Sequence, residues 1–93
     1  MNWYKLAYKS LSEKELDAFI KHLDKPIWIP VESCFIDAIA YHKEARVLEI
    51  KIKGTQYTFF GISNKTFKDF ANSPSKGKFF NEIIKPKYKY LQK

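Results

Sequence analysis

The side chains with the clearest chemical pattern lie near the end of the chain, where lysines alternate with tyrosines. Residues 65–93 hold eight lysines and two acidic residues, whereas residues 1–64 hold nine basic and eight acidic ones, so most of the net charge of +7 lies in the last third. Ammonium groups neutralise phosphates, and tyrosine rings stack on bases. The pattern predicts a polyanionic partner; the alternative is a lysine-rich face that only keeps the protein in solution.

The candidate binding residues centre on the start of a predicted helix. Ser75-Lys76-Gly77-Lys78 would form its first turn, where unpaired N–H groups and the positive end of the helix dipole favour an anion. In the alternative interpretation Ser75 is only a cap, Gly77 permits close packing of helix and sheet, Asn81 fastens a loop and Tyr57 belongs to the core. The full candidate set for nucleic-acid binding is Ser75, Lys76, Gly77, Lys78, Asn81, Lys85, Lys87, Tyr88, Lys89, Tyr90 and Tyr57.

The sequence offers little for catalysis or metal binding. It contains His22 in a predicted helix, His42 at a predicted hairpin turn and a single cysteine, Cys34, ahead of an apolar strand. Acid–base or nucleophilic catalysis needs a base held beside its target, and a zinc site needs several ligands at close spacing. We therefore expect a non-catalytic protein without metal or cofactor, with both histidines as surface polar residues and Cys34 as a small buried one.

The length and composition predict one small cytoplasmic domain. Ninety-three residues, 45% of them hydrophobic and 17% aromatic, can build one core but not two. No apolar run approaches the roughly 20 residues that span a bilayer. The chain also starts without the apolar segment and cleavage site of a secretory signal, so no membrane partner is expected.

The first element that frames these residues is an amphipathic helix over residues 12–24. Ser12 and Glu15 form a capping box, in which each side chain satisfies a backbone N–H of the other residue. The apolar residues that follow recur at helical spacing, namely Leu16, Phe19, Ile20 and Leu23. After Pro26, the short apolar run Ile27–Ile29 is predicted to be β-prone, and Pro30 favours an edge position.

Three strands are predicted over residues 35–42, 46–53 and 56–60. The middle one alternates strictly, which places Glu49, Lys51 and Lys53 on one face that we expect to be solvated. Short connections between these runs, including the one at Gly54, indicate antiparallel neighbours.

Two short helices and a tail are predicted to close the chain. Ser63 or Asn64 can cap the first helix and Ser75 the second, and Pro86 ends the second. The tail Lys87–Leu91 alternates lysine with larger side chains. The expected fold is α+β: a three-stranded antiparallel β-meander with two C-terminal helices and an added N-terminal helix.

Several short segments also occur in a recognisable order and spacing. They are Ile39-Ala40-Tyr41, Leu48-Glu49-Ile50, Gly54 with Tyr57-Thr58-Phe59, Ser73-Pro74-Ser75-Lys76-Gly77-Lys78-Phe79-Phe80-Asn81, and Ile84 through Tyr88. Together they resemble the KTSC domain, a short module found at the C-terminus of some lysyl-tRNA synthetases and as stand-alone bacterial and phage proteins. The resemblance implies a KTSC-like domain over residues 33–90, preceded by an N-terminal extension over residues 1–32 that carries the amphipathic helix.

The sequence departs from the family pattern at a few positions. Cys34 and Phe35 stand where the family usually has small polar residues, and Ala40 stands where it usually has a glycine. His42 occupies a position that is often aspartate in the family, and Ser63 one that is frequently proline. None of these departures lies in residues 75–81. Attachment to a tRNA synthetase implies RNA as a partner by association only.

The preferred hypothesis is therefore non-catalytic binding of nucleic acid, more plausibly RNA, through the C-terminal lysines and tyrosines. The alternative is a protein–protein interaction module, a phage or accessory factor, that uses the apolar segments Trp3–Tyr8 and Ile27–Val31 as contact surfaces.

Overall fold

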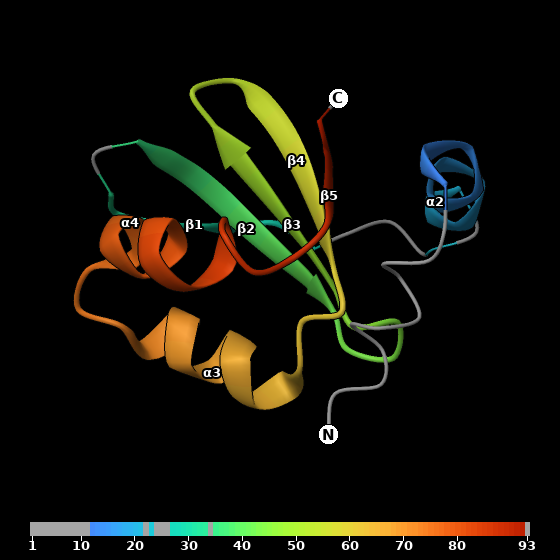
Figure 1. Ribbon diagram of the computed structural model, residues 1–93. Helices are drawn as coiled ribbons and strands as arrows, with labels where there is room; N and C mark the ends of the chain where they lie inside the picture. Colours follow the sequence, from blue (N-terminus) through green and yellow to red (C-terminus); the bar gives the residue numbers. More distant parts are fainter. Residues whose placement is uncertain (1–11, 22, 24–26, 34, 93) are drawn as a thin grey trace.

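A five-stranded antiparallel sheet with the order β1-β2-β3-β4-β5 forms the centre of the computed structural model (Figure 1). The structure describes residues 12–21, 23, 27–33 and 35–92. The strands are β1 (Ile29–Pro30), β2 (Ile36–His42), β3 (Val47–Ile52), β4 (Thr55–Phe60) and β5 (Tyr90–Gln92). The α+β class and the antiparallel meander of β2, β3 and β4 are confirmed, but the sheet has five strands where three were predicted.

The two additional strands lie at the edges of the sheet. Pro30 of β1 has no N–H to donate, and β1 takes the edge position that its proline favours, paired with Ala38 of β2. The segment predicted as a tail forms β5, in which Tyr90 pairs with Phe59 and Leu91 with Thr58. The three-strand prediction is wrong here because so short a strand depends on hydrogen bonds from its neighbour.

The turn between β3 and β4 consists of two residues, Lys53 and Gly54. Their φ angles are +47° and +84°, as expected for a type I′ hairpin turn, in which both central residues have positive φ. The backbone N–H of Gly54 donates a hydrogen bond to Asp37 Oδ2 at 3.1 Å. The turn is therefore tied to β2 and holds Lys53 at one end of the sheet.

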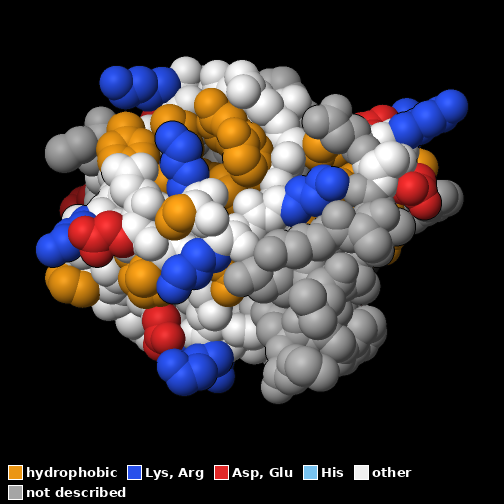
Figure 2. All heavy atoms as spheres, viewed as in Figure 1, with side chains coloured by type: hydrophobic (Ala, Val, Ile, Leu, Met, Phe, Trp, Pro, Cys, Tyr) orange, Lys and Arg blue, Asp and Glu red, His pale blue; other side chains and the backbone are white. Residues whose placement is uncertain are grey.

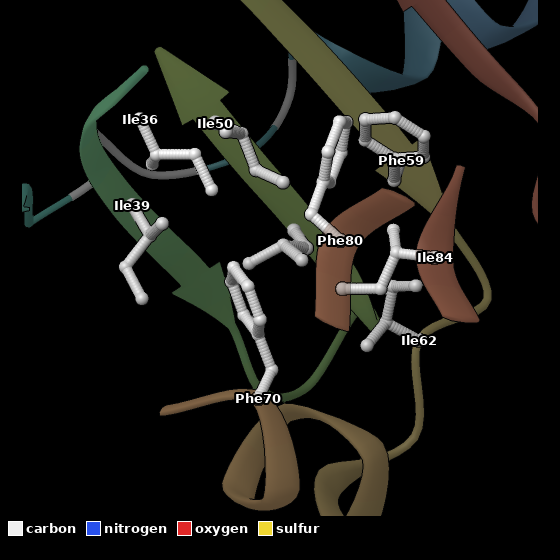
Figure 3. Packing of buried hydrophobic residues seen from close by; sticks show 9 residues of the cluster. Ile36, Ile39, Ile50, Phe59, Ile62, Phe70, Phe80 and Ile84 are labelled. Carbon is white, nitrogen blue, oxygen red and sulfur yellow. The ribbon is translucent and has the colours of Figure 1, made fainter. Parts of the chain in front are cut away.

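One face of the sheet is covered by the C-terminal helices, α3 (Asn64–Asn72) and α4 (Lys76–Phe79), the latter continuing as the π-helix η1 (Phe80–Ile84). Both predicted C-terminal helices are confirmed. Figure 3 shows side chains from β2, β3 and β4 and from these helices meeting in one core. The core consists of Ile36, Ile39, Leu48, Ile50, Phe59, Ile62, Phe70, Phe80 and Ile84.

The opposite face of the sheet receives the N-terminal helix α2 (Glu13–Ile20), which lies away from α3 and α4 (Figure 1). The capping box is present: Ser12 N–H donates to Glu15 Oε1 and Glu15 N–H to Ser12 Oγ. Leu16 is fully buried against Val47 and Phe60. The predicted helix is confirmed, although α2 ends at Ile20 instead of residue 24.

Part of the charged face of β3 is buried, contrary to the prediction that it is solvated. Glu49 is only 3% exposed, and its carboxylate lies 2.7 Å from His42 Nε2 and accepts a hydrogen bond from Gln56 Nε2, also at 2.7 Å. These partners across the sheet supply the polar contacts that a buried carboxylate needs. His42 is therefore a partner of a buried acid and not a surface residue of a turn.

Some predictions fall outside the described part of the chain, namely those for Trp3–Tyr8, His22 and Cys34. Within the described ranges, every helix is too short or too polar to cross a lipid bilayer.

Candidate nucleic-acid interface

An open pocket of about 460 Å³ lies on the helix-covered face of the sheet, where the β3–β4 turn, β5 and η1 approach one another. Figure 2 shows hydrophobic side chains gathered over this part of the molecule, with lysines beside them. We call it the aromatic pocket. Its lining residues are Phe35, Ile52, Lys53, Tyr57, Phe59, Phe80, Asn81, Lys85, Tyr90 and Gln92.

The sheet provides the aromatic wall of this pocket. The Tyr90 ring is stacked on Phe59, with centroids 5.1 Å apart and planes 28° apart, and contacts Tyr57 edge-on at 6.0 Å. Phe59 is 1% exposed, whereas Tyr90 is 42% exposed. Tyr90 is thus a ring supported by a buried ring and still open to solvent, the arrangement of a stacking platform.

The rim of the aromatic pocket is polar and basic. Lys53 and Lys85 are both exposed, and so are the side-chain amides of Asn81 and Gln92. Within the described part of the chain, none of these four side chains forms a hydrogen bond or an ion pair, and no carboxylate lines the pocket. Their donors are therefore available to a ligand.

A second hollow of about 310 Å³ adjoins the aromatic pocket, because Phe35 and Asn81 line both. We call it the Ser75 hollow. Among the described residues that line it, Glu32 carries a carboxylate and two are lysines. Its lining residues are Glu32, Ser33, Phe35, Pro74, Ser75, Lys76, Gly77, Lys78 and Asn81.

The helix start in the Ser75 hollow is largely explained by folding. Ser75 Oγ accepts a hydrogen bond from Lys78 N–H at 3.4 Å, which is a cap. Gly77 is buried, and a Cβ atom built on it would lie 2.6 Å from Phe35 Cε1. Lys76 Nζ donates to the carbonyl oxygen of Ser73 at 3.2 Å. Lys78 remains the exposed cation of this segment.

The remaining predicted residues lie outside both cavities. Tyr88 is half-buried and packs against the core, and its N–H donates to the carbonyl oxygen of Ile84 at 3.3 Å. The Lys89 carbonyl oxygen accepts a hydrogen bond from Phe60 N–H at 3.0 Å, while Lys87 is exposed. The structure thus places Tyr57, Asn81, Lys85 and Tyr90 together and separates Tyr88 from them.

Several pocket residues were not predicted from the sequence. The sequence places Lys53 on a solvated strand face, and it does not mark Gln92 or Phe35 as binding residues. The adjacent Gly54 is the feature of the sequence that could have placed Lys53 in the turn, because a two-residue turn holds its first residue at the tip of a hairpin. Gln92 joins the site through its pairing with Tyr57, which depends on β5.

The described residues contain no group of three or more histidine, cysteine, aspartate or glutamate side chains that could hold a metal ion. The candidate site therefore offers stacking surfaces and ammonium groups as its means of binding.

The sequence model of the KTSC domain matches residues 32–88, which is more than half of the chain. The chain belongs to the KTSC family. This confirms the resemblance, and the matched range includes the β2–β4 meander and both C-terminal helices.

Relatives of this KTSC protein occur in two settings. Over 62 residues it is 34% identical to a lysine–tRNA ligase of Nostoc punctiforme, in a match that covers 66% of this chain and only 11% of the ligase. Over 61 residues it is 31% identical to a small protein of Tsukamurella paurometabola, covering 64% of this chain and 91% of that protein. The KTSC protein thus corresponds to a small part of the first relative and to nearly all of the second.

The fold agrees with that of a crystal structure. A KTSC domain protein of Yersinia pestis superimposes with a TM-score of 0.71 and 30% sequence identity, covering 74% of this chain and 99% of the other. The two proteins therefore share the KTSC fold.

Proposed function

We propose that this KTSC protein binds single-stranded nucleic acid without catalysing a reaction, and that RNA is its preferred form. The observation that carries the proposal is the combination of the exposed Tyr90 ring, supported by Phe59, with ammonium groups on the same pocket. Base stacking together with phosphate neutralisation is the usual chemistry of single-strand binding.

The charges favour a polyanion that passes through both cavities. Lys78 lies in the Ser75 hollow and Lys53 and Lys85 in the aromatic pocket, and the two cavities meet at Phe35 and Asn81. A flexible strand could therefore contact all three lysines in succession. The only carboxylate that lines either cavity, among the described residues, is that of Glu32 in the Ser75 hollow.

RNA is preferred because of the relatives. The lysine–tRNA ligase of Nostoc punctiforme acts, by its name, on a tRNA, and this chain is similar to a short part of it. That similarity supports RNA over DNA but assigns none of the ligase's activity to this chain. Lysine is a point charge without the planar fork of arginine, and stacking tolerates any base, so we expect little sequence preference.

The salt dependence of RNA binding tests this proposal. A fluorescein-labelled single-stranded decamer is titrated by anisotropy at several salt concentrations, with wild type and with the triple variant Lys53→Gln, Lys78→Gln, Lys85→Gln. Each lost phosphate contact on a single strand lowers the slope of log K against log salt by about 0.7, so the slope should fall by about 2.

The matched control removes the same charge elsewhere, through Lys14→Gln, Lys43→Gln and Lys68→Gln. All three control lysines are exposed, and none lines either cavity. This variant should keep the wild-type slope. Equal slopes for both triple variants, or no binding by wild type, would refute the proposed interface.

One observation favours a second candidate, a protein partner on β1. Ile27 is 84% exposed and Ile29 50% exposed, and within the described residues β1 pairs with β2 alone. A partner with an apolar surface could pack against these two exposed side chains.

A further inference from the structure

The shape of the aromatic pocket goes beyond what a flat stacking surface requires. Its volume of about 460 Å³ falls within the roughly 300–1,000 Å³ typical of small-molecule sites. Its rings are inclined to one another: Phe59 meets Phe80 at 90° and Tyr57 meets Tyr90 at 60°. Phe59 and Phe80 are buried behind this lining, so an inserted ring would meet the exposed Tyr90 ring together with the half-buried rings of Tyr57 and Phe35, whereas a platform offers one face only.

We propose that the aromatic pocket binds one nucleotide, with an unstacked base inserted among the rings and its phosphate held by Lys53 and Lys85. The inference rests on the proposed nucleic-acid function. It specifies in addition what the pocket recognises, namely a single nucleotide that is splayed out of the strand or lies at its end. Unstacked bases of this kind are the usual targets of proteins that bind single-stranded RNA.

The polar groups of the rim suit the edge of a base. Asn81 enters from η1 and Gln92 from β5, and each side-chain amide offers both a donor and an acceptor. The edge of a base carries hydrogen-bond donors and acceptors. A side-chain amide can rotate so that its NH₂ group faces an acceptor and its carbonyl oxygen faces a donor. The pocket therefore accommodates several bases and would discriminate only weakly among them.

The two lysines come from backbone segments that hydrogen bonds hold in place. Lys53 belongs to the type I′ turn, whose Gly54 N–H is bonded to Asp37 Oδ2, and Lys85 N–H donates to the Phe80 carbonyl oxygen at 2.9 Å. Asn81 and Lys85 lie four positions apart, on the same side of the helical run. Among the described residues that line the pocket, a phosphate on the rim would thus meet two cations and no carboxylate.

The direct test is a ¹⁵N NMR titration of the full chain with adenosine 5′-monophosphate. We expect saturable shifts of the backbone amides of Asn81, Lys85, Tyr90 and Gln92. Adenosine, ribose 5-phosphate and inorganic phosphate serve as partial ligands. Adenosine should cause weaker shifts of the same amides, and ribose 5-phosphate and phosphate should cause none in Tyr90 and Gln92.

Variants separate the two halves of the ligand. Tyr90→Leu should weaken binding of adenosine 5′-monophosphate by about tenfold, because it removes a stacking partner. Lys53→Gln should weaken it by about threefold, as expected for an exposed ion pair, and leave adenosine binding unchanged. Lys43→Gln, on an exposed turn, should change neither. Native-like spectra of each variant establish that the fold is retained.

The outcomes distinguish this inference from the function on which it rests. If the RNA decamer binds but the mononucleotide shifts none of the pocket amides, the single-nucleotide site is wrong and the broader proposal stands. If phosphate alone reproduces every shift, the pocket is an anion site and base insertion is wrong. If the mononucleotide binds in the pocket but no RNA binds, the single-nucleotide site stands and the proposed function is wrong.

Discussion

The ring of Phe35 lies so close to Gly77 that a Cβ atom on the glycine would sit 2.6 Å from Phe35 Cε1. Phe35 also approaches Phe80, with centroids 6.3 Å apart, and it lines both the aromatic pocket and the Ser75 hollow. The glycine of the family motif therefore allows α4 to approach the sheet and keeps Phe35 in the wall between the two cavities.

We predict that Gly77→Ala destabilises the protein by about 1–3 kcal/mol, the usual cost of overpacking a well-packed contact. Urea unfolding followed by circular dichroism measures this change. Combining Gly77→Ala with Phe35→Leu should cost less than the sum of the two single changes, because the smaller side chain leaves room for the methyl group. If the losses in the free energy of unfolding were strictly additive, the contact between Gly77 and Phe35 would not be the cause of the destabilisation.

Tyr41 should make the stability sensitive to alkaline pH. Its hydroxyl lies 2.6 Å from the Ile62 carbonyl oxygen and 2.9 Å from Asn64 Oδ1, and its ring is stacked on Phe67 at 4.3 Å. Burial raises the pKa of Tyr41 above its ordinary value of 10.0. The neutral phenol is thus favoured in the folded state, and its contribution is complete below pH 10 and is lost as the pH rises through the folded-state pKa.

The substitution Tyr41→Phe isolates this effect. It should cost about 1 kcal/mol at pH 8, because a hydrogen bond to the backbone is lost. In urea unfolding between pH 8 and pH 11, the variant should lose less stability than wild type. An identical pH dependence in the two proteins would exclude Tyr41 as the responsible group.

The buried pair of His42 and Glu49 should be important for folding. Removing the imidazole in His42→Ala leaves the Glu49 carboxylate, which is 3% exposed, with the side-chain amide of Gln56 as its hydrogen-bond partner among the described residues. Breaking a buried pair in this way typically costs about 3 kcal/mol or more. The neighbouring Lys43→Ala, at an exposed site, should change stability by no more than about 0.5 kcal/mol. Equal urea midpoints for the two variants would contradict this account.

Elements specified by local sequence were predictable. The capping box of Ser12 and Glu15 and the cap at Ser75 depend on residues three positions apart, and both are present. The alternation in β3 and the tight turn at Gly54 likewise predicted the meander. These features depend on the secondary-structure preferences of residues that are close together in the chain, so they can be predicted from the sequence alone.

Features that depend on distant partners were not predictable. Glu49 is buried because His42 and Gln56 reach it across the sheet, and alternation alone could not show this. Strand β5 exists through its pairing with β4, and that pairing brings Gln92 beside Tyr57. The candidate site was therefore found in part from the sequence, through its lysines and tyrosines, whereas the pocket that joins them required the topology.

Photo-cross-linking of a 4-thiouridine-labelled RNA decamer, followed by mass spectrometry of the digested complex, tests the proposed interface most directly. The cross-linked peptides are predicted to carry Tyr57, Tyr90 or Phe35, and an excess of unlabelled RNA should abolish the signal. Cross-links confined to Trp28 and its neighbours in residues 27–31, or none that unlabelled RNA removes, would contradict the assignment of the aromatic pocket as the nucleic-acid site.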